Sequence, residues 1–215
     1  MIGPVMIGPS SSHTAGVVRI GKVAFNLLGG IPEKAIITFY NSFARTYEGH
    51  GSDRAILAGL MGFATDDKRI KNAYDHTEDN GLAFEFKSVG NASTMHPNTV
   101  KLEVSKGGES MTVVGESRGG GVIKIVEVNG FAAGFTAALH TLVIEAEDKS
   151  GSIAYITQVL SNDDCNIATM SVSRKGKNDI ACQVLEIDSG VRPLTLQYLQ
   201  SLSWIKKVIY IPNVE

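Results

Sequence analysis

Six short segments within residues 141–211 limit the fold more than any other part of the sequence. Apolar residues alternate, as they do in strands, over residues 141–147, 167–173, 179–187 and 206–211. Helical spacing follows Gly151 and Pro193, and proline is favoured in the first turn of a helix. The order strand-helix-strand-strand-helix-strand predicts a ferredoxin-like unit.

The preceding part of the chain predicts a second unit of mixed α/β structure, so the expected fold class is α+β. Apolar spacing indicates helices over residues 15–28 and 53–63. Strands are expected over residues 34–40, 83–89, 100–105, 111–116 and 122–128. The polar stretch 65–80 is expected to be helical or irregular.

A small, apolar stretch at residues 129–138 suggests a connector between the two units. The predicted domains are therefore residues 1–138 and residues 139–215. Apolar residues make up 43% of the 215-residue chain, which is enough to form a buried core. Gly119-Gly120-Gly121 precedes an alternating strand, whereas a phosphate-binding loop opens a helix. We interpret this glycine run as a turn or bulge.

Charge and hydropathy exclude several classes of partner. The formal net charge is -2 and no basic block is present, so nucleic acid is not an expected partner. No apolar run reaches the roughly 18 residues that span a bilayer. Residues 1–9 lack the basic and apolar regions of a signal peptide. These features predict a cytoplasmic protein that does not bind membranes.

Two cysteines, Cys165 and Cys182, are the only thiols in the chain. A single disulfide stays open as an alternative, although cytosolic chains usually keep such thiols reduced. Four-iron clusters are generally held by three or four thiolates, so this chain is not expected to hold one alone. Histidines at H-x-x-x-H spacing are also absent from the sequence, which disfavours a zinc site.

A serine-rich segment, G-P-S-S-S-H-T at residues 8–14, directly precedes the first predicted helix. Unpaired N–H groups and the helix dipole favour an anion at a helix N-terminus. Three serines and a histidine therefore suggest a binding loop. An ordinary serine N-cap is the alternative.

Two further segments carry histidine. G-H-G-S-D-R at residues 49–54 places His50 between glycines, which allow a ligand to approach closely. Ser52 or Asp53 is also suited to cap the following helix. M-H-P-N at residues 95–98 has the composition of an ordinary turn. Imidazoles and hydroxyls together suit an amino-acid substrate, which needs carboxylate donors and a proton acceptor.

These three motifs, in this order, resemble the beta portion of bacterial iron–sulfur L-serine dehydratases. Residues 119–131 and the ferredoxin-like segment are similar too. The resemblance implies an allosteric-substrate-binding-like first domain and a C-terminal ACT domain. It also implies a partner alpha subunit that carries a 4Fe-4S cluster and completes an enzyme converting L-serine to pyruvate and ammonia. Relatives typically have a few more residues before the equivalent of residues 1–4.

The resemblance also assigns site residues. It implies active-site roles for His50, Ser52 and His96, with Ser52 standing where the family commonly has threonine. It implies substrate binding by Ser10, Ser11, Ser12, His13, Thr14 and Asn98. Our hypothesis is that His50 is the leading general base and that His96 assists or orients the substrate. His76 and His140 are expected to be solvated or structural.

For the ACT-like part we expect a homodimer and an amino-acid or dimer site at Gly151, Ser152 and Ile153. A purely structural dimer remains the alternative there. Two other functions compete with catalysis: a non-catalytic serine-sensing module and an assembly protein for the catalytic chain. A pyridoxal-phosphate dehydratase is less favoured, because no Schiff-base lysine site is recognisable in the sequence.

Overall fold

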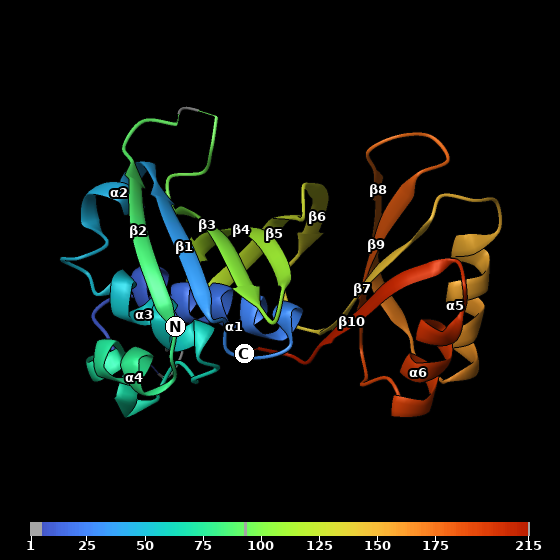
Figure 1. Cartoon of the computed structure of the whole chain (residues 1–215), viewed down its shortest axis with the longest axis horizontal. Helices are drawn as coiled ribbons and strands as arrows, with labels where there is room; N and C mark the ends of the chain where they lie inside the picture. The colour runs from blue at the N-terminus through green and yellow to red at the C-terminus, as the bar shows by residue number, and fades with distance from the viewer. Residues whose placement is uncertain (1–5, 93, 215) are drawn as a thin grey trace. The chain divides into compact units, whose positions relative to one another are not determined.

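The computed structural model describes residues 6–92 and 94–214, so residues 1–4, where the sequence analysis compared the chain with its relatives, lie outside the described part. The chain forms two compact units, Met1–Gly130 and Phe131–Glu215 (Figure 1). The first unit thus ends eight residues before the boundary expected at residue 138. Of the stretch 129–138 that was predicted to be a connector, residues 131–138 group with the second unit.

The first unit contains the elements that the apolar pattern predicts. Its helical segments are η1 (Ser11–Ala15, a π-helical turn), α1 (Gly16–Leu28), α2 (Asn41–Thr46), α3 (Ser52–Leu60), η2 (Lys68–Asn72, a 3-10 turn) and α4 (Ala73–Asp79). Its strands are β1 (Lys34–Tyr40), β2 (Ala83–Val89), β3 (Thr99–Lys106), β4 (Glu109–Gly119) and β5 (Val122–Val128). Gly119, Gly120 and Gly121 all have positive φ and join β4 to β5, which confirms the predicted turn.

Helix α2 is the element that the apolar pattern does not predict. It is six residues long, too short to show a helical repeat. Asn41 has a φ of 51°, in the left-handed region that asparagine tolerates better than most residues. This residue ends β1 and turns the chain directly into α2.

One sheet organises the first unit, with its strands in the order β2-β1-β3-β4-β5. Strands β1 and β2 are parallel, and the other neighbours are antiparallel. Helices α1 and α3 cover one face of this sheet (Figure 1). Ile20 of α1 packs over Gly115 of β4, where an added Cβ would lie 2.7 Å from its side chain. The absence of a side chain at Gly115 therefore lets α1 lie close to the sheet.

The two covering helices meet through their backbones at Gly21 and Gly59. A Cβ on Gly21 would lie 2.7 Å from the Ile56 carbonyl oxygen, and a Cβ on Gly59 would lie 2.2 Å from the Val18 carbonyl oxygen. Neither space can hold a side chain, so glycine on both helices permits this crossing. The crossing fixes the N-terminal ends of α1 and α3, which follow the serine-rich and His50 segments.

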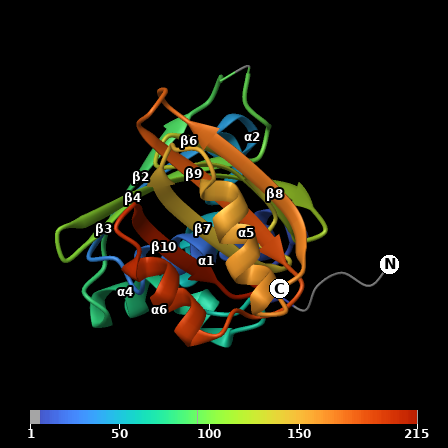
Figure 2. The same cartoon turned by 90° about the vertical axis from the view of Figure 1, so that its right-hand side faces the viewer.

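From β7 onward the second unit has the predicted order of strands and helices. Strand β6 precedes this order, within the stretch that was expected to be a connector, and was not predicted. Its elements are β6 (Phe131–Phe135), β7 (His140–Glu147), α5 (Ser152–Asn162), β8 (Ile167–Arg174), β9 (Ile180–Ile187), α6 (Pro193–Ser201) and β10 (Ile205–Ile211). The four-stranded sheet has the order β10-β7-β9-β8 and is antiparallel throughout. Helices α5 and α6 cover one face of it (Figure 2). Leu142, Ile144, Leu185 and Leu199 are among the fully buried residues of this core.

A buried carboxylate ties residues 136–137 to the second unit. Glu186 of β9 is 4% exposed, and its Oε1 accepts bonds from Thr136 N at 2.9 Å, Thr136 Oγ1 at 2.7 Å and Ala137 N at 3.2 Å. Its Oε2 accepts a fourth bond from Thr169 Oγ1 at 2.9 Å. Because a buried charge is costly without such partners, these hydrogen bonds hold Thr136 and Ala137 against β9. Residues 136 and 137 accordingly belong to the second unit.

Within residues 6–92 and 94–214, no helix is both long enough and apolar enough to span a bilayer.

The Gly21–Gly59 crossing makes a stability prediction. Gly59→Ala should lower the free energy of unfolding by about 1–3 kcal/mol, because the added methyl group forces the helices apart. Urea denaturation of the full chain measures this change. Gly90→Ala is the matched control, since nothing lies within 4 Å of a Cβ at Gly90. Equal stability of the two variants would contradict the proposed backbone contact.

Candidate active site

The serine-rich loop is folded around the His13 side chain. Ser10 is the N-cap of η1, and its hydroxyl accepts a hydrogen bond from His13 N at 3.3 Å. The hydroxyls of Ser12 and Ser10 also lie 3.0 Å and 3.3 Å from His13 Nδ1. Ser11 turns elsewhere, since its Oγ accepts a bond from Gly120 N at 3.2 Å. Two of the three predicted serines therefore face a histidine that belongs to the same loop.

The second segment lies against this loop. The rings of His13 and His50 have centroids 4.6 Å apart. Ser52 is fully buried, and its hydroxyl donates to the His13 carbonyl oxygen at 2.9 Å. His50 is exposed, whereas His13 is half-buried. The structure thus brings together the serine-rich segment and the His50 segment, which lie far apart in the sequence.

Thr46 at the end of α2 contacts both imidazoles and orients them. Its hydroxyl donates to the Ser42 carbonyl oxygen at 2.8 Å, so it must accept from His13 Nε2 at 3.1 Å. Neutral His13 therefore carries its proton on Nε2, and Nδ1 accepts from a serine hydroxyl. His50 Nδ1 donates to the Thr46 carbonyl oxygen at 3.3 Å, which leaves the Nε2 lone pair of His50 without a partner from this contact.

The third segment joins the others through its backbone. The Pro97 carbonyl oxygen accepts bonds from Ser42 N at 2.9 Å and Phe43 N at 3.3 Å, which caps the start of α2. The Asn98 carbonyl oxygen accepts from Ser117 N at 3.0 Å, and the Ser117 hydroxyl donates to the Ser12 carbonyl oxygen at 2.8 Å. All three motifs are thereby linked in one hydrogen-bonded assembly.

His96 itself is held within its own loop. Its Nδ1 accepts a hydrogen bond from Asn98 N at 3.2 Å, so the neutral ring carries its proton on Nε2. The Thr99 hydroxyl donates to the His96 carbonyl oxygen at 2.7 Å. Asn41 holds the same loop from α2, accepting from Ala92 N at 2.7 Å and donating to the Met95 carbonyl oxygen at 3.1 Å. His96 is thus linked to the histidine pair through shared supports and presents a donor.

Electrostatics favour the neutral form of His13. Burial, and then the nearby His50 charge, hold the pKa of His13 below its ordinary value. The edge of Phe43 packs against the His13 ring, with centroids 5.0 Å apart, and adds to its apolar surroundings. At neutral pH His13 is therefore suited to accept and donate hydrogen bonds as an uncharged ring.

Several supporting residues were not predicted. Thr46 and Phe43 belong to α2, which no apolar repeat predicts. Ser117 lies on β4, more than a hundred residues after Ser12. Only the folded arrangement brings these residues to the site. Asn41 offered a signal, because asparagine directly after a strand suits a left-handed turn.

The comparisons with known proteins agree on one family. A model described as "Serine dehydratase beta chain" matches residues 2–127. The probable L-serine dehydratase beta chain of Bacillus subtilis (strain 168) is 43% identical over 99% of this chain and 96% of that protein. The chain belongs to the serine dehydratase beta-chain family.

Two further likenesses accompany this family assignment. The L-serine dehydratase beta chain of Peptoniphilus asaccharolyticus is 37% identical over 91% of this chain and 87% of that protein. The crystal structure of the ACT domain from GTP pyrophosphokinase of Chlorobium tepidum is 26% identical and covers 33% of this chain and 94% of that one. Its TM-score of 0.28 supports no conclusion about the fold.

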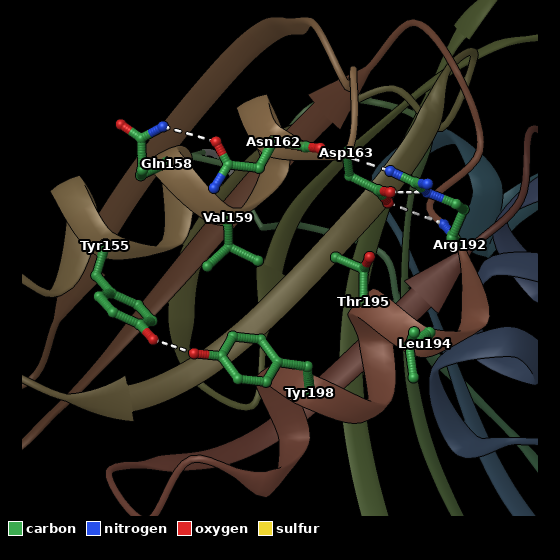
Figure 3. Close-up of a pocket in the computed structure, with 9 residues that line it drawn as sticks. All are labelled: Tyr155, Gln158, Val159, Asn162, Asp163, Arg192, Leu194, Thr195 and Tyr198. Atoms are coloured by element: carbon green, nitrogen blue, oxygen red, sulfur yellow. Dashed lines mark hydrogen bonds and ion pairs between the residues drawn. The ribbon is translucent and has the colours of Figure 1, made fainter.

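Among the cavities in the second unit of this serine dehydratase beta-chain family member, two are lined by residues of α5. One, of about 450 Å³, lies at the start of α5 and is lined by Gly151, Ser152, Ile153 and Gln183, among others. Another, of about 580 Å³, lies between α5 and α6 (Figure 3). There Arg192 pairs with Asp163, and the hydroxyl groups of Tyr155 and Tyr198 are hydrogen bonded. These two contacts bridge the helices.

The thiols of this family member do not fit an iron–sulfur cluster. Both cysteines are free, buried and located in the second unit. Burial raises the pKa of the Cys182 thiol to about 12, and burial also raises the pKa of Cys165. In the described ranges, no group of three or more His, Cys, Asp or Glu side chains is arranged to hold a metal ion.

The contact between the two imidazoles makes a titration prediction. His50→Gln should raise the pKa of His13, because removing the His50 charge relieves repulsion of the imidazolium form. Burial remains, so the pKa should stay below the ordinary value. Proton NMR titration of the His13 ring measures the shift, with His76→Gln as the control. An unchanged or lowered His13 pKa in the His50 variant would contradict this coupling.

Proposed function

We propose that this chain is the beta subunit of an L-serine dehydratase, which converts L-serine to pyruvate and ammonia together with an alpha subunit. The convergence of His50, His13 and the serine-rich loop in a member of this family carries the proposal. A non-catalytic serine-sensing module would share the fold, but it would not need a proton acceptor such as the imidazole lone pair of His50. The names of the related beta chains also favour the dehydratase.

His50 is the proposed general base, which takes the α-proton of L-serine. Its Nδ1 donates to the Thr46 carbonyl oxygen, and this contact favours the tautomer whose Nε2 can accept a proton. His13 is less suited, because its Nδ1 lone pair faces the hydroxyls of Ser10 and Ser12. The exposure of His50 suits a site that a partner chain completes.

The remaining residues of the motifs are assigned to binding and positioning. His96 presents an Nε2 donor, which suits orientation of the substrate better than removal of a proton. Ser52 is assigned to positioning, since its buried hydroxyl is engaged by the His13 carbonyl. Ser10, Ser12 and Thr14 are assigned to substrate binding, and Ser11 and Asn98 to holding the surrounding loops.

The proposal leaves the 4Fe-4S cluster to the alpha subunit. Two buried thiols offer too few ligands for such a cluster. This chain's own task is then to bind the amino acid and hold or move its α-proton. We assign the assembled enzyme to the cytoplasm, and the ACT-like unit to homodimer formation.

Catalysis by His50 has a direct test. In the complex with an anaerobically prepared alpha chain, His50→Ala should lower kcat about a hundred- to ten-thousand-fold, the usual contribution of a general base. Iron and sulfide content should stay at the wild-type level, because this histidine holds no cluster. His76→Ala is the matched control. Near-normal turnover of His50→Ala in an intact complex would remove His50 from the mechanism.

We further propose that the second unit is an ACT domain that binds a small amino acid at the start of α5. Backbone N–H groups in the first turn of a helix favour a carboxylate. Gln183 is fully buried beside this cavity, and neither its side-chain nitrogen nor its oxygen has a hydrogen-bond partner among the described residues. A buried amide without partners is costly, which supports a polar ligand there.

The unsatisfied amide predicts opposite effects on stability and binding. Gln183→Leu should raise the free energy of unfolding of the ligand-free chain by about 1–2 kcal/mol, because an unpaired polar group is replaced by an apolar one. The same variant should lose the heat of L-serine binding to the second unit in calorimetry. Gln197→Leu, an exposed substitution on α6, is the control. A destabilised Gln183→Leu chain that still binds L-serine there would refute the assignment.

A further inference from the structure

A small cavity beside His50 is formed where the serine-rich segment and the His50 segment meet residues of η2. It has a volume of about 140 Å³ and is lined by Thr14, His50, Gly51, Arg54, Ile70 and Lys71, among others. A water molecule takes about 30 Å³ of liquid. The cavity therefore has room for a ligand of a few non-hydrogen atoms, such as a small amino acid.

One wall of this cavity carries a buried hydroxyl without a partner. Thr14 is 2% exposed, and its Oγ1 has no hydrogen-bond partner in the part of the chain that the structure describes. Gly8 covers it closely, since a Cβ on Gly8 would lie 2.3 Å from that oxygen. Because buried hydroxyls are nearly always hydrogen bonded, Thr14 points to a polar group of a ligand.

Two positively charged side chains, Arg54 and Lys71, also line the cavity. Arg54 and Lys71 are both exposed, and no ion pair joins either one to a carboxylate of the described residues. The neighbouring carboxylate of Asp53 is buried and accepts a hydrogen bond from the Tyr74 hydroxyl at 2.7 Å. Two cations without paired carboxylates at one small cavity favour an anionic group, and a guanidinium matches a carboxylate well.

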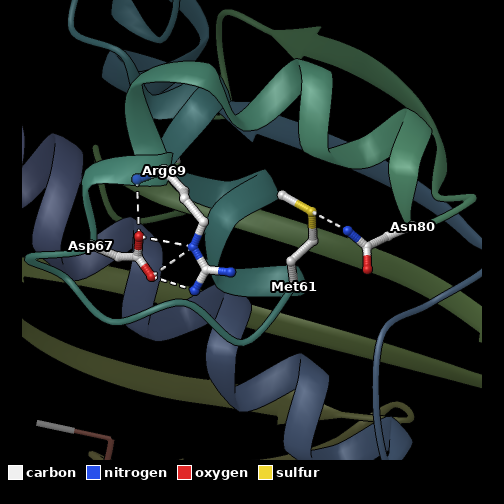
Figure 4. Close-up of polar contacts among 4 residues, drawn as sticks. All are labelled: Met61, Asp67, Arg69 and Asn80. Carbon is white, nitrogen blue, oxygen red and sulfur yellow. Dashed lines mark hydrogen bonds and ion pairs between the residues drawn. The ribbon is translucent and has the colours of Figure 1, made fainter.

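Both cations stand on supported elements. Arg54 belongs to α3, which the Gly21–Gly59 crossing fixes. Lys71 belongs to η2, whose N-cap Asp67 accepts bonds from Arg69 N at 2.9 Å and from the Arg69 guanidinium at 2.6 Å (Figure 4). The Arg69 guanidinium also lies 3.9 Å from the centre of the Phe63 ring. This local scaffold holds η2 where Lys71 lines the cavity.

We propose that Arg54 and Lys71 bind the carboxylate of the amino-acid substrate, with Thr14 contacting a second polar group and His50 at the α-carbon. The assignment rests on the proposed dehydratase function. It gives a role to Arg54, which the sequence analysis left without one although it lies in the His50 segment, and to Lys71, which lies outside the motifs. Both residues are proposed to contact the substrate already in the ground state, before the reaction begins. They therefore act on the KM for L-serine and leave the proton-transfer step to His50.

Kinetics of the complex with the alpha chain test this assignment. Arg54→Gln and Lys71→Gln should each raise the KM for L-serine about tenfold while kcat changes little, the signature of lost ground-state binding. Wild-type KM should rise with ionic strength, because salt screens exposed charges, and this dependence should flatten in the double variant. L-serinamide, which lacks the carboxylate, should inhibit wild type and both variants equally.

Lys68→Gln is the matched control, because it removes the same charge from η2 at a residue outside the cavity lining. Its KM and salt dependence should match those of wild type. Unchanged KM and salt dependence in the Arg54 and Lys71 variants would overturn the assignment, as would an equal effect of Lys68→Gln. A wild-type complex without dehydratase activity would instead refute the proposed function, so the two failures are distinguishable.

Discussion

The close contact of α1 and α3 at Gly21 and Gly59 is the constraint on which the site depends. Helices that touch through their backbones have little freedom to slide, because neither surface has side chains that could repack. Both helices begin at the candidate site, one after the serine-rich loop and the other after His50. The position of the two imidazoles is therefore set by packing several residues away, within a rigid layer on the sheet.

A second level of organisation uses short-range hydrogen bonds. Helix α2 carries the Thr46 side chain, and the carbonyl oxygen of Pro97 caps its first turn. Thr46 in turn selects the tautomer of His13, while its carbonyl group orients His50. One threonine thus gives two neighbouring histidines different hydrogen-bonding states. Such a difference is useful for proton transfer, because the His50 ring can accept a proton while the His13 ring stays fixed by its hydrogen bonds.

The sequence predicts the elements better than the connections between them. The ferredoxin-like order in residues 141–211 and the glycine turn before β5 follow from periodicity and local backbone preferences. Hydrogen bonds link the three histidine- or serine-containing motifs in the structure, and periodicity alone does not place them together. Helix α2 escaped prediction because six residues cannot show a helical repeat. The partners Thr46 and Ser117 are fixed by tertiary contacts, which no local pattern encodes.

The connector illustrates a different limit. Small apolar residues at 129–138 resemble a flexible link, yet the buried carboxylate of Glu186 on β9 binds Thr136 and Ala137. That carboxylate receives three of its four hydrogen bonds from this stretch. A fragment cut at residue 139 would leave a charge buried in the sheet with a single donor. The second unit therefore keeps the donors to this buried charge only when it includes Thr136 and Ala137, which matters for anyone who wishes to express it alone or graft it onto another enzyme.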